Sequence, residues 1–460
     1  MELTTNPENK QVGDLSFPAR KVWLKTYGCQ MNYHDSERIL AHLSELNFTP
    51  TDDQNDADLL LFNTCAIRDL ANQKFYSHLG ETKKFKDVKI GVSGCIAQTD
   101  SKELLKKYKH LNFAFGTDAV DNVKEMVYRA YAGEDKFAVT SWDKTGDYSI
   151  ETKITHGSPQ AFVNIIKGCD KFCSYCIVPF TRGREKSRRL QEVVDDVTKL
   201  VQHSGIQEVT LLGQNVNSYG KDNGESLAQL ITELEKISGL QLIRYTTSHP
   251  YDVSDELIAV HGTSKKLSNH LHLPIQSGSN TVLQRMLREY TVEHYLGLVE
   301  KLRKSNPNIV ISSDIIAGFP NETQEEHQAT LDLLKQARFD FIYSYAFSSR
   351  PGTKAARMND ILDDEVRGQR LRQIQAQQIE IQAEVRQEMV GKTYRVLVEE
   401  KTAFKNEEKW KARTNCNRIV HFQTSAGENL QWNWVDVKVV SATALSCQAE
   451  FITSYGRFLN

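Results

Sequence analysis

The feature of this sequence that most restricts its fold is a repeated alternation of short apolar runs with longer stretches of helical periodicity. Apolar runs at 22–27, 58–63 and 88–93 begin the series, and a stretch with helical spacing follows each of them. Strands that are separated by helices pair in parallel through right-handed crossovers. The first part of the chain is therefore predicted to be a three-layer α/β domain with three parallel strands.

The alternation resumes after a polar, turn-rich link at about 141–160. Six further runs are predicted as strands, at 161–167, 208–213, 242–247, 270–274, 309–317 and 341–347. Helical stretches lie between them, near 190–203, 226–237, 254–261, 280–304 and 323–337. About six β/α units are too few for a full eight-stranded barrel, so we expect an open or partial (β/α)6 barrel.

The last part of the chain has a different pattern. Residues 363–390 are charged and rich in Gln, with helical spacing, and are predicted to form a linking helix. Short β-like runs separated by turns then predict a small all-β barrel. We expect a disordered tail at 1–20, an N-terminal domain at 21–140, a central domain at 155–388 and the β-barrel at 391–454. Cys416 and Cys447, in the last of these, have no second ligand nearby in sequence and are interpreted as structural.

Length and composition set the remaining limits. The chain has 460 residues, 40% of them apolar, and no apolar run approaches the ~20 residues that span a bilayer. The polar N-terminus lacks the apolar core of a signal peptide, so we expect a cytoplasmic protein with no membrane partner. The eight cysteines are then better explained as metal ligands or buried thiols than as disulfides. The net charge is −2, with basic stretches at 182–189 and 401–418 that suit either a solvated surface or phosphate contacts.

Three cysteines lie close together in the segment GCDKFCSYC, at Cys169, Cys173 and Cys176. A structural zinc site needs four closed ligands. The nearest histidines, His156 and His203, do not lie at a ligand-like spacing. Three ligands suit a metal centre that keeps one position open.

Three other cysteines follow the predicted strands of the first domain. Cys29, Cys65 and Cys95 each lie just beyond the carboxyl end of a strand. These ends meet at one edge of a parallel sheet, which is where α/β domains place their functional sites. Three buried thiols are the alternative. We favour a second metal site.

The spacing CxxxCxxC, with Tyr175 before the last cysteine, resembles the signature of the radical S-adenosylmethionine enzymes. The triplet alone would also suit a zinc site or an electron-transfer site. Longer segments, among them KTYGCQMNYHDSER, NTCAIRDLANQK, SGCIAQ, LLGQNVNSYG, TTSHP, LHLPIQSGS and SSDIIAGFP, resemble the MiaB-type tRNA methylthiotransferases. The resemblance runs from about residue 21 to the end, where the tail is similar to a TRAM domain, an RNA-binding β-barrel.

This resemblance implies two [4Fe–4S] clusters and S-adenosyl-L-methionine as cofactors. Cys169, Cys173 and Cys176 would hold three irons of one cluster and leave the fourth iron free for S-adenosylmethionine. Cys29, Cys65 and Cys95 would hold a second, sulfur-donating cluster. The implied reaction places a methylthio group on carbon 2 of an N6-isopentenyladenosine beside the tRNA anticodon. One S-adenosylmethionine would methylate a cluster sulfur, and another would be cleaved to the radical that removes hydrogen from the base.

Other functions within and outside this family stay open from sequence alone. Related enzymes act on threonylcarbamoyladenosine in tRNA or on an aspartate of a ribosomal protein. A non-catalytic iron–sulfur RNA-binding protein is a further alternative. The motif TTSHP and the basic stretch 401–418 favour RNA. We expect a monomer that binds the anticodon stem-loop of tRNA and receives electrons from a flavodoxin- or ferredoxin-type reductant.

The side chains that contact the cofactor and the base can be predicted only by position. Tyr175 is expected to contact the adenine of S-adenosylmethionine, and Gly318 to allow a close approach of the backbone to the ligand. Polar residues that follow the barrel strands are candidates for cofactor or base contacts: Gln214, Asn215, Ser248, His249, Gln276 and Ser277. Arg182 and Arg184 continue from the cysteine loop and are expected to contact RNA phosphates.

Overall fold

A computed structural model describes residues 17–66, 69–142, 148, 150–152, 154, 157–404, 407–424 and 428–456. His156 and most of the predicted N-terminal tail lie outside these residues. The described chain begins at Phe17, whose ring packs against Phe48 and Tyr131. Its contacts form two compact units, one with residues 1–146, 152–156 and 180–183, the other with 147–151, 157–179 and 184–460. Apart from a few residues, 180–183 among them, the predicted central and C-terminal domains therefore belong to one unit.

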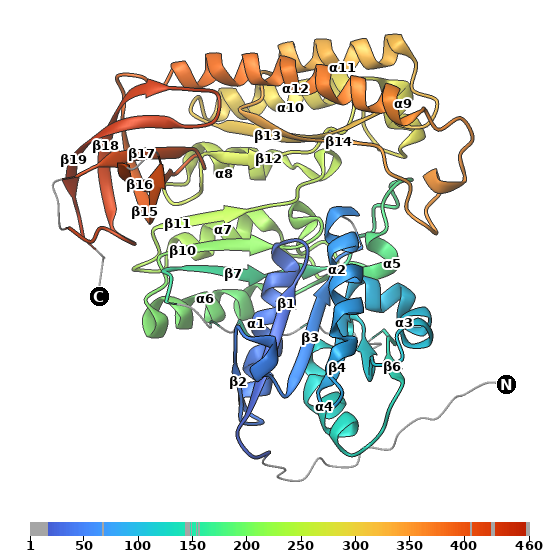
Figure 1. The fold of residues 1–460 in the computed structure, drawn as a ribbon. Helices are drawn as coiled ribbons and strands as arrows, with labels where there is room; N and C mark the ends of the chain where they lie inside the picture. The colour runs from blue at the N-terminus through green and yellow to red at the C-terminus, as the bar shows by residue number, and fades with distance from the viewer. Residues whose placement is uncertain are drawn as a thin grey trace. The chain divides into compact units, whose positions relative to one another are not determined.

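The first unit contains a six-stranded parallel sheet in the order β2-β1-β3-β4-β5-β6 (Figure 1). Its strands are β1 (Arg20–Thr26), β2 (Phe48–Pro50), β3 (Leu59–Thr64), β4 (Lys89–Gly94), β5 (Phe113–Phe115) and β6 (Phe137–Val139). The three predicted strands are β1, β3 and β4. The other three were not predicted, because runs of three residues are too short to show a period.

Helices cover both faces of this sheet. They are α1 (Gln30–Ser44), α2 (Asp69–Glu81), α3 (Cys95–Lys107) and α4 (Val123–Tyr131). Apolar residues of α1 and α4 pack in one core cluster with Val22 and Leu61 of the sheet. Those of α2 and α3 pack in a second cluster with Leu60 and Phe62, which point to the other face. The predicted three-layer arrangement is therefore confirmed.

The second unit begins with the parallel strands of the partial barrel. They are β7 (Gln160–Asn164), β10 (Glu208–Leu212), β11 (Leu242–Tyr245), β12 (His270–His272), β13 (Val310–Ala317) and β14 (Phe341–Ala346). They form two three-stranded sheets, β11-β10-β7 and β12-β13-β14. A parallel bridge between Ile243 and Leu267 continues the hydrogen bonding from β11 towards β12. The six strands predicted for an open barrel are all present.

The helices of this barrel follow the strands in order. They are α6 (Leu190–Ser204), α7 (Leu227–Glu235), α8 (Asp255–Thr263), α9 (Asn280–Arg285), α10 (Val292–Ser305) and α11 (Gln324–Ala337). One helix was predicted at 280–304, but the structure has two. Leu287 has a φ of 57°, a left-handed conformation that no α-helix continues through. The chain therefore turns between α9 and α10.

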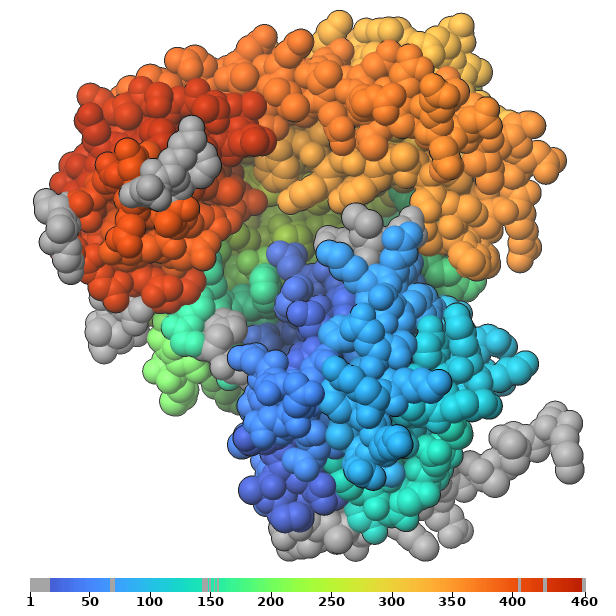
Figure 2. All heavy atoms as spheres, viewed as in Figure 1, coloured from blue at the N-terminus to red at the C-terminus, as the bar shows by residue number. Residues whose placement is uncertain are grey.

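The C-terminal part consists of α12 (Asp364–Gln387) and a closed five-stranded barrel. The strands are β15 (Thr393–Phe404), β16 (Glu407–Thr414), β17 (Ile419–Gln423), β18 (Trp434–Ala442) and β19 (Cys447–Ser454). In Figure 2 the atoms of this barrel, in red, lie directly against those of α12, in orange. Cys416 and Cys447 are both buried, as structural cysteines would be.

Hydrogen bonds join the closed barrel to the partial barrel. Arg244 of β11 forms an ion pair of 2.8 Å with Glu208 and also donates to the backbone oxygens of Thr414 and Asn415. The indole Nε1 of Trp434 donates to Gln207 Oε1 at 3.0 Å. These buried polar contacts make the two barrels one packed body. Among the described helices, none is long and apolar enough to cross a membrane.

Candidate functional site

The three N-terminal cysteines lie at the carboxyl edge of the six-stranded sheet. Cys29 is the residue before α1, Cys65 follows β3 directly, and Cys95 is the first residue of α3. Gly28 has a φ of 126°, and a Cβ added to it would lie 2.5 Å from Cys65 Cβ and 3.1 Å from Cys65 Sγ. The turn at Gly28 and Cys29 therefore lies in contact with Cys65, although the two are far apart in sequence.

A buried arginine accompanies this N-terminal triad. Arg182, the last residue of the short helix α5 (Val178–Arg182), donates from Nη1 to Asp35 Oδ2 at 2.7 Å and from Nη2 to Asn32 Oδ1 at 3.0 Å. Burial lowers its pKa, whereas Asp35 and the nearby Cys95 and Cys29 raise it, and the net shift is upward. The guanidinium is therefore charged and neutralised by Asp35.

This contact overturns the prediction that Arg182 meets RNA phosphates. Its side chain is only 7% exposed, and its charge is already paired within the first unit. Arg184 is different, because 68% of its side chain is exposed. It lies 3.1 Å from Asp170 and over the ring of Phe172. Of the two arginines, only Arg184 is accessible to a phosphate.

The central cysteines lie in the loop after β8 (Ile166–Lys167). Cys169 and Cys173 are buried, and Cys176 is partly buried. Burial raises the pKa of the Cys176 thiol to about 12, and the nearby Cys173 adds to the shift. Burial likewise raises the pKa of Cys169, and Cys176 and Cys173 contribute in the same direction. The three thiols are therefore near enough to influence one another.

The donor set suits a cluster better than a single ion. Within the described residues, no three His, Cys, Asp or Glu side chains form a group that could hold one metal ion. A single ion needs all its ligand atoms about 2.3 Å from one centre, whereas an iron–sulfur cluster binds each thiolate to a different iron. Each triad offers three thiols. Both triads fit an iron–sulfur cluster with one open iron.

A second buried arginine, Arg288, contacts the central triplet. Its Nη1 donates to Cys173 Sγ at 3.3 Å, its Nη2 to the backbone oxygen of Pro274 at 2.9 Å, and its Nε to the hydroxyl of Tyr290 at 2.7 Å. Sequence analysis did not identify this residue. It lies 115 positions from the cysteine that it contacts, so no local spacing could reveal it.

The cysteine loop is anchored by Lys171, between the first two cysteines. Its ammonium group lies 2.7 Å from Glu289 and 3.4 Å from Asp252, whose side chain is fully buried. Asp252 also accepts from Asn215 Nδ2 at 2.8 Å and from Lys221 at 2.5 Å. These bonds tie the cysteine loop to the loops that follow β10 and β11.

The same loops carry buried polar atoms that no described residue satisfies. They are Gln214 Oε1, Asn215 Oδ1, Ser248 Oγ and His249 Nε2. Burial lowers the pKa of His249 to about 2, and Arg288 and Lys171 add to this shift, so the ring is neutral. Buried polar atoms in folded proteins almost always have a partner. Four unsatisfied atoms at the carboxyl ends of two adjacent strands indicate a site for a polar ligand.

The remaining predicted contacts differ in their surroundings. Tyr175 is partly buried, and its ring packs edge-on against Phe319. Gln276 has a φ of 79°, and its backbone bonds to Asp314 and Ile316. Ser277 is buried beside Thr330. At Gly318, with a φ of 69°, an added Cβ would lie 2.5 Å from Arg367 Cγ, so the packing of α12 already requires glycine there.

One face of the sheet β12-β13-β14 is polar and aromatic. His272 bonds through Nδ1 to Ser312 at 2.9 Å and lies through Nε2 3.3 Å from Asp314. Tyr343 packs against His272, and half of its side chain is exposed. Helices α10, α11 and α12 cover the opposite, apolar face (Figure 1), so this face is turned to the interior of the open barrel. Sequence analysis did not single out these residues, although alternate polar residues in a buried strand were a usable signal.

The basic stretch in the C-terminal barrel is largely neutralised. Strand β15 supplies Glu399 and Glu400, which pair with Lys411, and Glu399 also pairs with Arg413. Arg418 is buried against Asp340. Lys405 lies outside the described residues. The stretch is therefore less positive than its own sequence suggests, because its carboxylate partners come from a neighbouring strand and from Asp340, the residue before β14.

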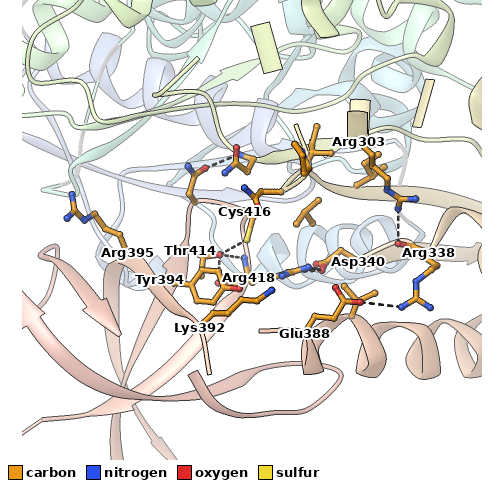
Figure 3. A pocket seen from close by; sticks show the side chains of 18 of the residues that line it. Arg303, Arg338, Asp340, Glu388, Lys392, Tyr394, Arg395, Thr414, Cys416 and Arg418 are labelled. Carbon is orange, nitrogen blue, oxygen red and sulfur yellow. Dashed lines mark hydrogen bonds and ion pairs between the residues drawn. The ribbon is translucent and has the colours of Figure 1, made fainter. Parts of the chain in front are cut away.

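A cavity of about 780 Å³ lies between the two barrels of the second unit (Figure 3). Asn269, Val310 and Asp340, which line it, stand at the amino-terminal starts of β12, β13 and β14. Figure 3 shows Arg338 directed to Glu388 and Arg418 directed to Asp340. The cavity is at the opposite edge of the sheet from the cysteine loop, so it is separate from the site described above.

Comparison with known families divides the chain into three parts. Residues 21–116 match the uncharacterized protein family UPF0004, residues 163–334 the radical SAM superfamily, and residues 387–452 the TRAM domain. These ranges contain the N-terminal triad, the central triplet with Arg288, and nearly all of the closed barrel respectively.

Three similar relatives carry the same enzyme name. A tRNA-2-methylthio-N(6)-dimethylallyladenosine synthase from Bdellovibrio bacteriovorus is 39% identical over 98% of this chain and 100% of its own length. Enzymes of the same name from Carboxydothermus hydrogenoformans and Ruegeria are 40% and 44% identical, over 91% and 84% of this chain. Among solved structures, the radical S-adenosylmethionine methyltransferase TsrM from Kitasatospora setae, with cobalamin and a [4Fe-4S] cluster bound, has a TM-score of 0.56 at 14% identity. It covers 74% of this chain and 77% of its own, a likeness of fold.

Proposed function

The chain belongs to the MiaB-type tRNA methylthiotransferases, and from this membership we propose how its residues divide the work of the reaction. The enzyme places a methylthio group on carbon 2 of N6-isopentenyladenosine in tRNA by radical S-adenosylmethionine chemistry. The observation that carries this conclusion is the match to enzymes of that name over nearly the whole of both chains. Its cofactors are an iron–sulfur cluster and S-adenosylmethionine.

Cys169, Cys173 and Cys176 hold the cluster of the radical site, and Cys29, Cys65 and Cys95 hold a second, sulfur-donating [4Fe–4S] cluster. When bound, a cluster with an open iron supplies the electron that cleaves S-adenosylmethionine. The donor chemistry supports both assignments, because three thiols without a fourth ligand leave one iron free. The two sites are called the radical cluster and the auxiliary cluster below.

The loops after β10 and β11 bind S-adenosylmethionine. The unsatisfied atoms of Gln214, Asn215, Ser248 and His249 supply donors and acceptors for its polar groups. Because His249 is neutral, it does not repel the positively charged sulfonium group. Lys171 and Asp252 hold the cysteine loop against these loops, so the cluster and the cofactor keep a constant separation. Tyr175 and Gln276 complete the cofactor contacts, and Gly318 shapes the same rim.

The interior face of β12–β14 receives the modified base. Tyr343 offers an exposed ring for stacking, and His272 with Asp314 offers polar groups for the edge of an adenine. A base on this face points towards the carboxyl edge, where the cysteine loop lies. The closed barrel binds the RNA backbone, and Arg184 contributes one phosphate contact.

The partners follow from the reaction. The substrate is the anticodon stem-loop of tRNA, and the reductant is a flavodoxin- or ferredoxin-type protein. We place the enzyme in the cytoplasm as a monomer, with domain limits at 21–140, 155–388 and 391–454. Activity on threonylcarbamoyladenosine or on a ribosomal-protein aspartate is less well supported, because the relatives carry the name of the isopentenyladenosine enzyme.

Nucleoside analysis tests this function. Cells that lack the gene should contain N6-isopentenyladenosine without the methylthio group, and the wild-type gene should restore 2-methylthio-N6-isopentenyladenosine. A Cys173→Ala gene should not restore it. Methylthiolated threonylcarbamoyladenosine, or a methylthiolated ribosomal protein with unchanged tRNA, would replace the proposed substrate by one of the alternatives.

A further inference from the structure

The two buried arginines beside the cysteine triads differ in one respect, the presence of a counter-ion. Arg182 forms an ion pair with Asp35 at 2.7 Å. Asp35 also lies 3.8 Å from the buried Arg38, which has its own partner in Asp121. Arg288 donates to a thiol, a carbonyl and a phenol, and no Asp or Glu among the described residues forms an ion pair with it. A buried guanidinium without an anion is unfavourable, because burial removes the water that solvated its charge.

The groups around Arg288 cannot supply the missing charge in the absence of a cluster. Burial raises the pKa of Tyr290 to about 12, so this phenol is neutral at pH 7. The carbonyl of Pro274 is a dipole without net charge. The one contact that becomes anionic when iron binds is Cys173, whose Sγ lies 3.3 Å from Nη1.

We propose that Arg288 is the counter-charge of the radical cluster and raises its reduction potential, whereas Asp35 cancels the same effect of Arg182 at the auxiliary cluster. A cluster held by three thiolates becomes more negative when it takes up an electron. A cation that donates a hydrogen bond to one of its sulfurs stabilises the reduced form. The low dielectric of the buried site strengthens this interaction.

The consequence concerns where a single electron goes. A flavodoxin- or ferredoxin-type donor supplies one electron at a time to a chain with two similar clusters. The uncancelled charge of Arg288 favours reduction of the radical cluster, where the electron is needed to cleave S-adenosylmethionine. The ion pair between Asp35 and Arg182 leaves the auxiliary cluster without this advantage. The inference rests on the proposed function, and in particular on the second cluster.

The test is a redox titration of the full-length, anaerobically reconstituted protein, followed by electron paramagnetic resonance. Changing Cys29, Cys65 and Cys95 together to Ala isolates the signal of the radical cluster. In that background, Arg288→Gln should lower the ratio of reduced to oxidised cluster at least tenfold at a fixed potential, about 59 mV for one electron. Arg288→Lys keeps the positive charge but loses the planar set of N–H donors of the guanidinium. It should lower the reduction potential by a smaller amount.

Arg285→Gln is the matched control. Arg285 lies three residues earlier, at the end of α9, and is paired with Glu326. No hydrogen bond joins its side chain to a described cysteine, so its loss should leave the potential unchanged. For the auxiliary cluster, Cys169, Cys173 and Cys176 are changed together to Ala. In that background Asp35→Asn should raise the reduction potential of the auxiliary cluster, because the positive charge of Arg182 is then no longer neutralised. An unchanged reduction potential of the radical cluster in both Arg288 variants would overturn the proposal. If Arg288→Gln assembles no cluster, the potential of Arg288→Lys alone decides.

The outcomes separate this inference from the proposed function. If wild-type protein yields iron for one cluster only, the proposal of a second cluster fails, and the comparison with Asp35 fails with it. If both clusters form and the potentials shift as expected, but tRNA gains no methylthio group, the proposed function fails while the role of Arg288 stands. A potential that moves equally in Arg285→Gln and Arg288→Gln would indicate a general structural effect and overturn the proposal.

Discussion

The two cysteine triads offer the same ligands but are assembled in different ways. Cys169, Cys173 and Cys176 lie in one loop, so their proximity follows from spacing alone. Cys29, Cys65 and Cys95 come from three separate strand ends, and the order of strands in a parallel sheet places them on one edge. The first kind of site is brought together by one loop, whereas the second depends on the sheet being formed.

The arginines extend this comparison from geometry to charge. Each triad has a buried guanidinium nearby. Within the part of the chain that the structure describes, Arg182 has a carboxylate partner and Arg288 has none. Similar sulfur ligands can therefore have different electrostatic surroundings. Four experiments test whether the two regions are as different as this comparison states.

The largest effect is expected from removing one cysteine of each triad. Cys173→Ala should abolish formation of 5′-deoxyadenosine, because the radical cluster loses a ligand. Cys65→Ala should leave measurable 5′-deoxyadenosine but no methylthio product. Anaerobic incubation with dithionite, S-adenosylmethionine and isopentenylated tRNA, followed by chromatography, measures both. The opposite pattern in the two variants would exchange the roles of the triads.

The second experiment compares two ion pairs near the cysteines. Asp35→Asn leaves buried Arg182 without a counter-ion and should lower the free energy of unfolding by about 3 kcal/mol. Asp170→Asn removes the partner of exposed Arg184 and should cost less than about 1 kcal/mol. Urea unfolding of both variants, with metal-free protein, measures the difference. Equal effects would show that burial does not distinguish the two pairs.

The third experiment concerns the unsatisfied polar atoms in the loops after β10 and β11 of the second unit. We assigned these atoms to cofactor binding. Gln214→Ala removes one acceptor and should weaken S-adenosylmethionine binding about tenfold, equal to about 1.4 kcal/mol. Gln328→Ala, on the exposed face of α11, is the control and should have no effect. Equilibrium dialysis gives both dissociation constants. Unchanged binding in the Gln214 variant would remove this residue from the cofactor site.

The fourth experiment concerns a difference in pH dependence between the two regions. Burial lowers the pKa of His249 to about 2, so the unfolded chain takes up a proton below its ordinary pKa of 6.5 and the folded chain does not. Stability from this residue is therefore lost as pH falls from 6.5 towards 2, by about 1.4 kcal/mol per pH unit at most. Burial raises the pKa of Glu37 to about 7, so its contribution has the opposite sign and improves as pH falls from 7 to 4.5.

Hydrogen exchange at pH 7 and pH 5 distinguishes these two trends. Peptides from the loops after β10 and β11 should lose protection at the lower pH, whereas those from α1 should keep or gain it. His249→Gln should flatten the response of the first set only. Parallel loss of protection in both sets, unaffected by this variant, would contradict the assignment of different titrating groups.

Sequence reasoning succeeded where the relevant information is local. The CxxxCxxC spacing and the apolar runs identified the central triplet, both α/β parts and the closed barrel. It failed for contacts between distant segments. Arg182 is 147 positions from Asp35, so its basic neighbourhood was interpreted as a surface for RNA. Arg288 was missed because nothing near it in sequence points to Cys173. The charge of residues 401–418 was overestimated because Glu399 and Glu400 lie just outside that range.

The bonds of Arg244 and Trp434 have a consequence for exchanging parts between related enzymes. A family boundary falls near residue 387, where a chimera would naturally be cut. Cutting there would leave Arg244 without the oxygens of Thr414 and Asn415, and Gln207 without its indole donor. A transplanted barrel therefore needs a host whose residues at 207 and 244 are compatible with it. In this protein, the part that would have to be exchanged as a whole is larger than the segment that matches the TRAM domain.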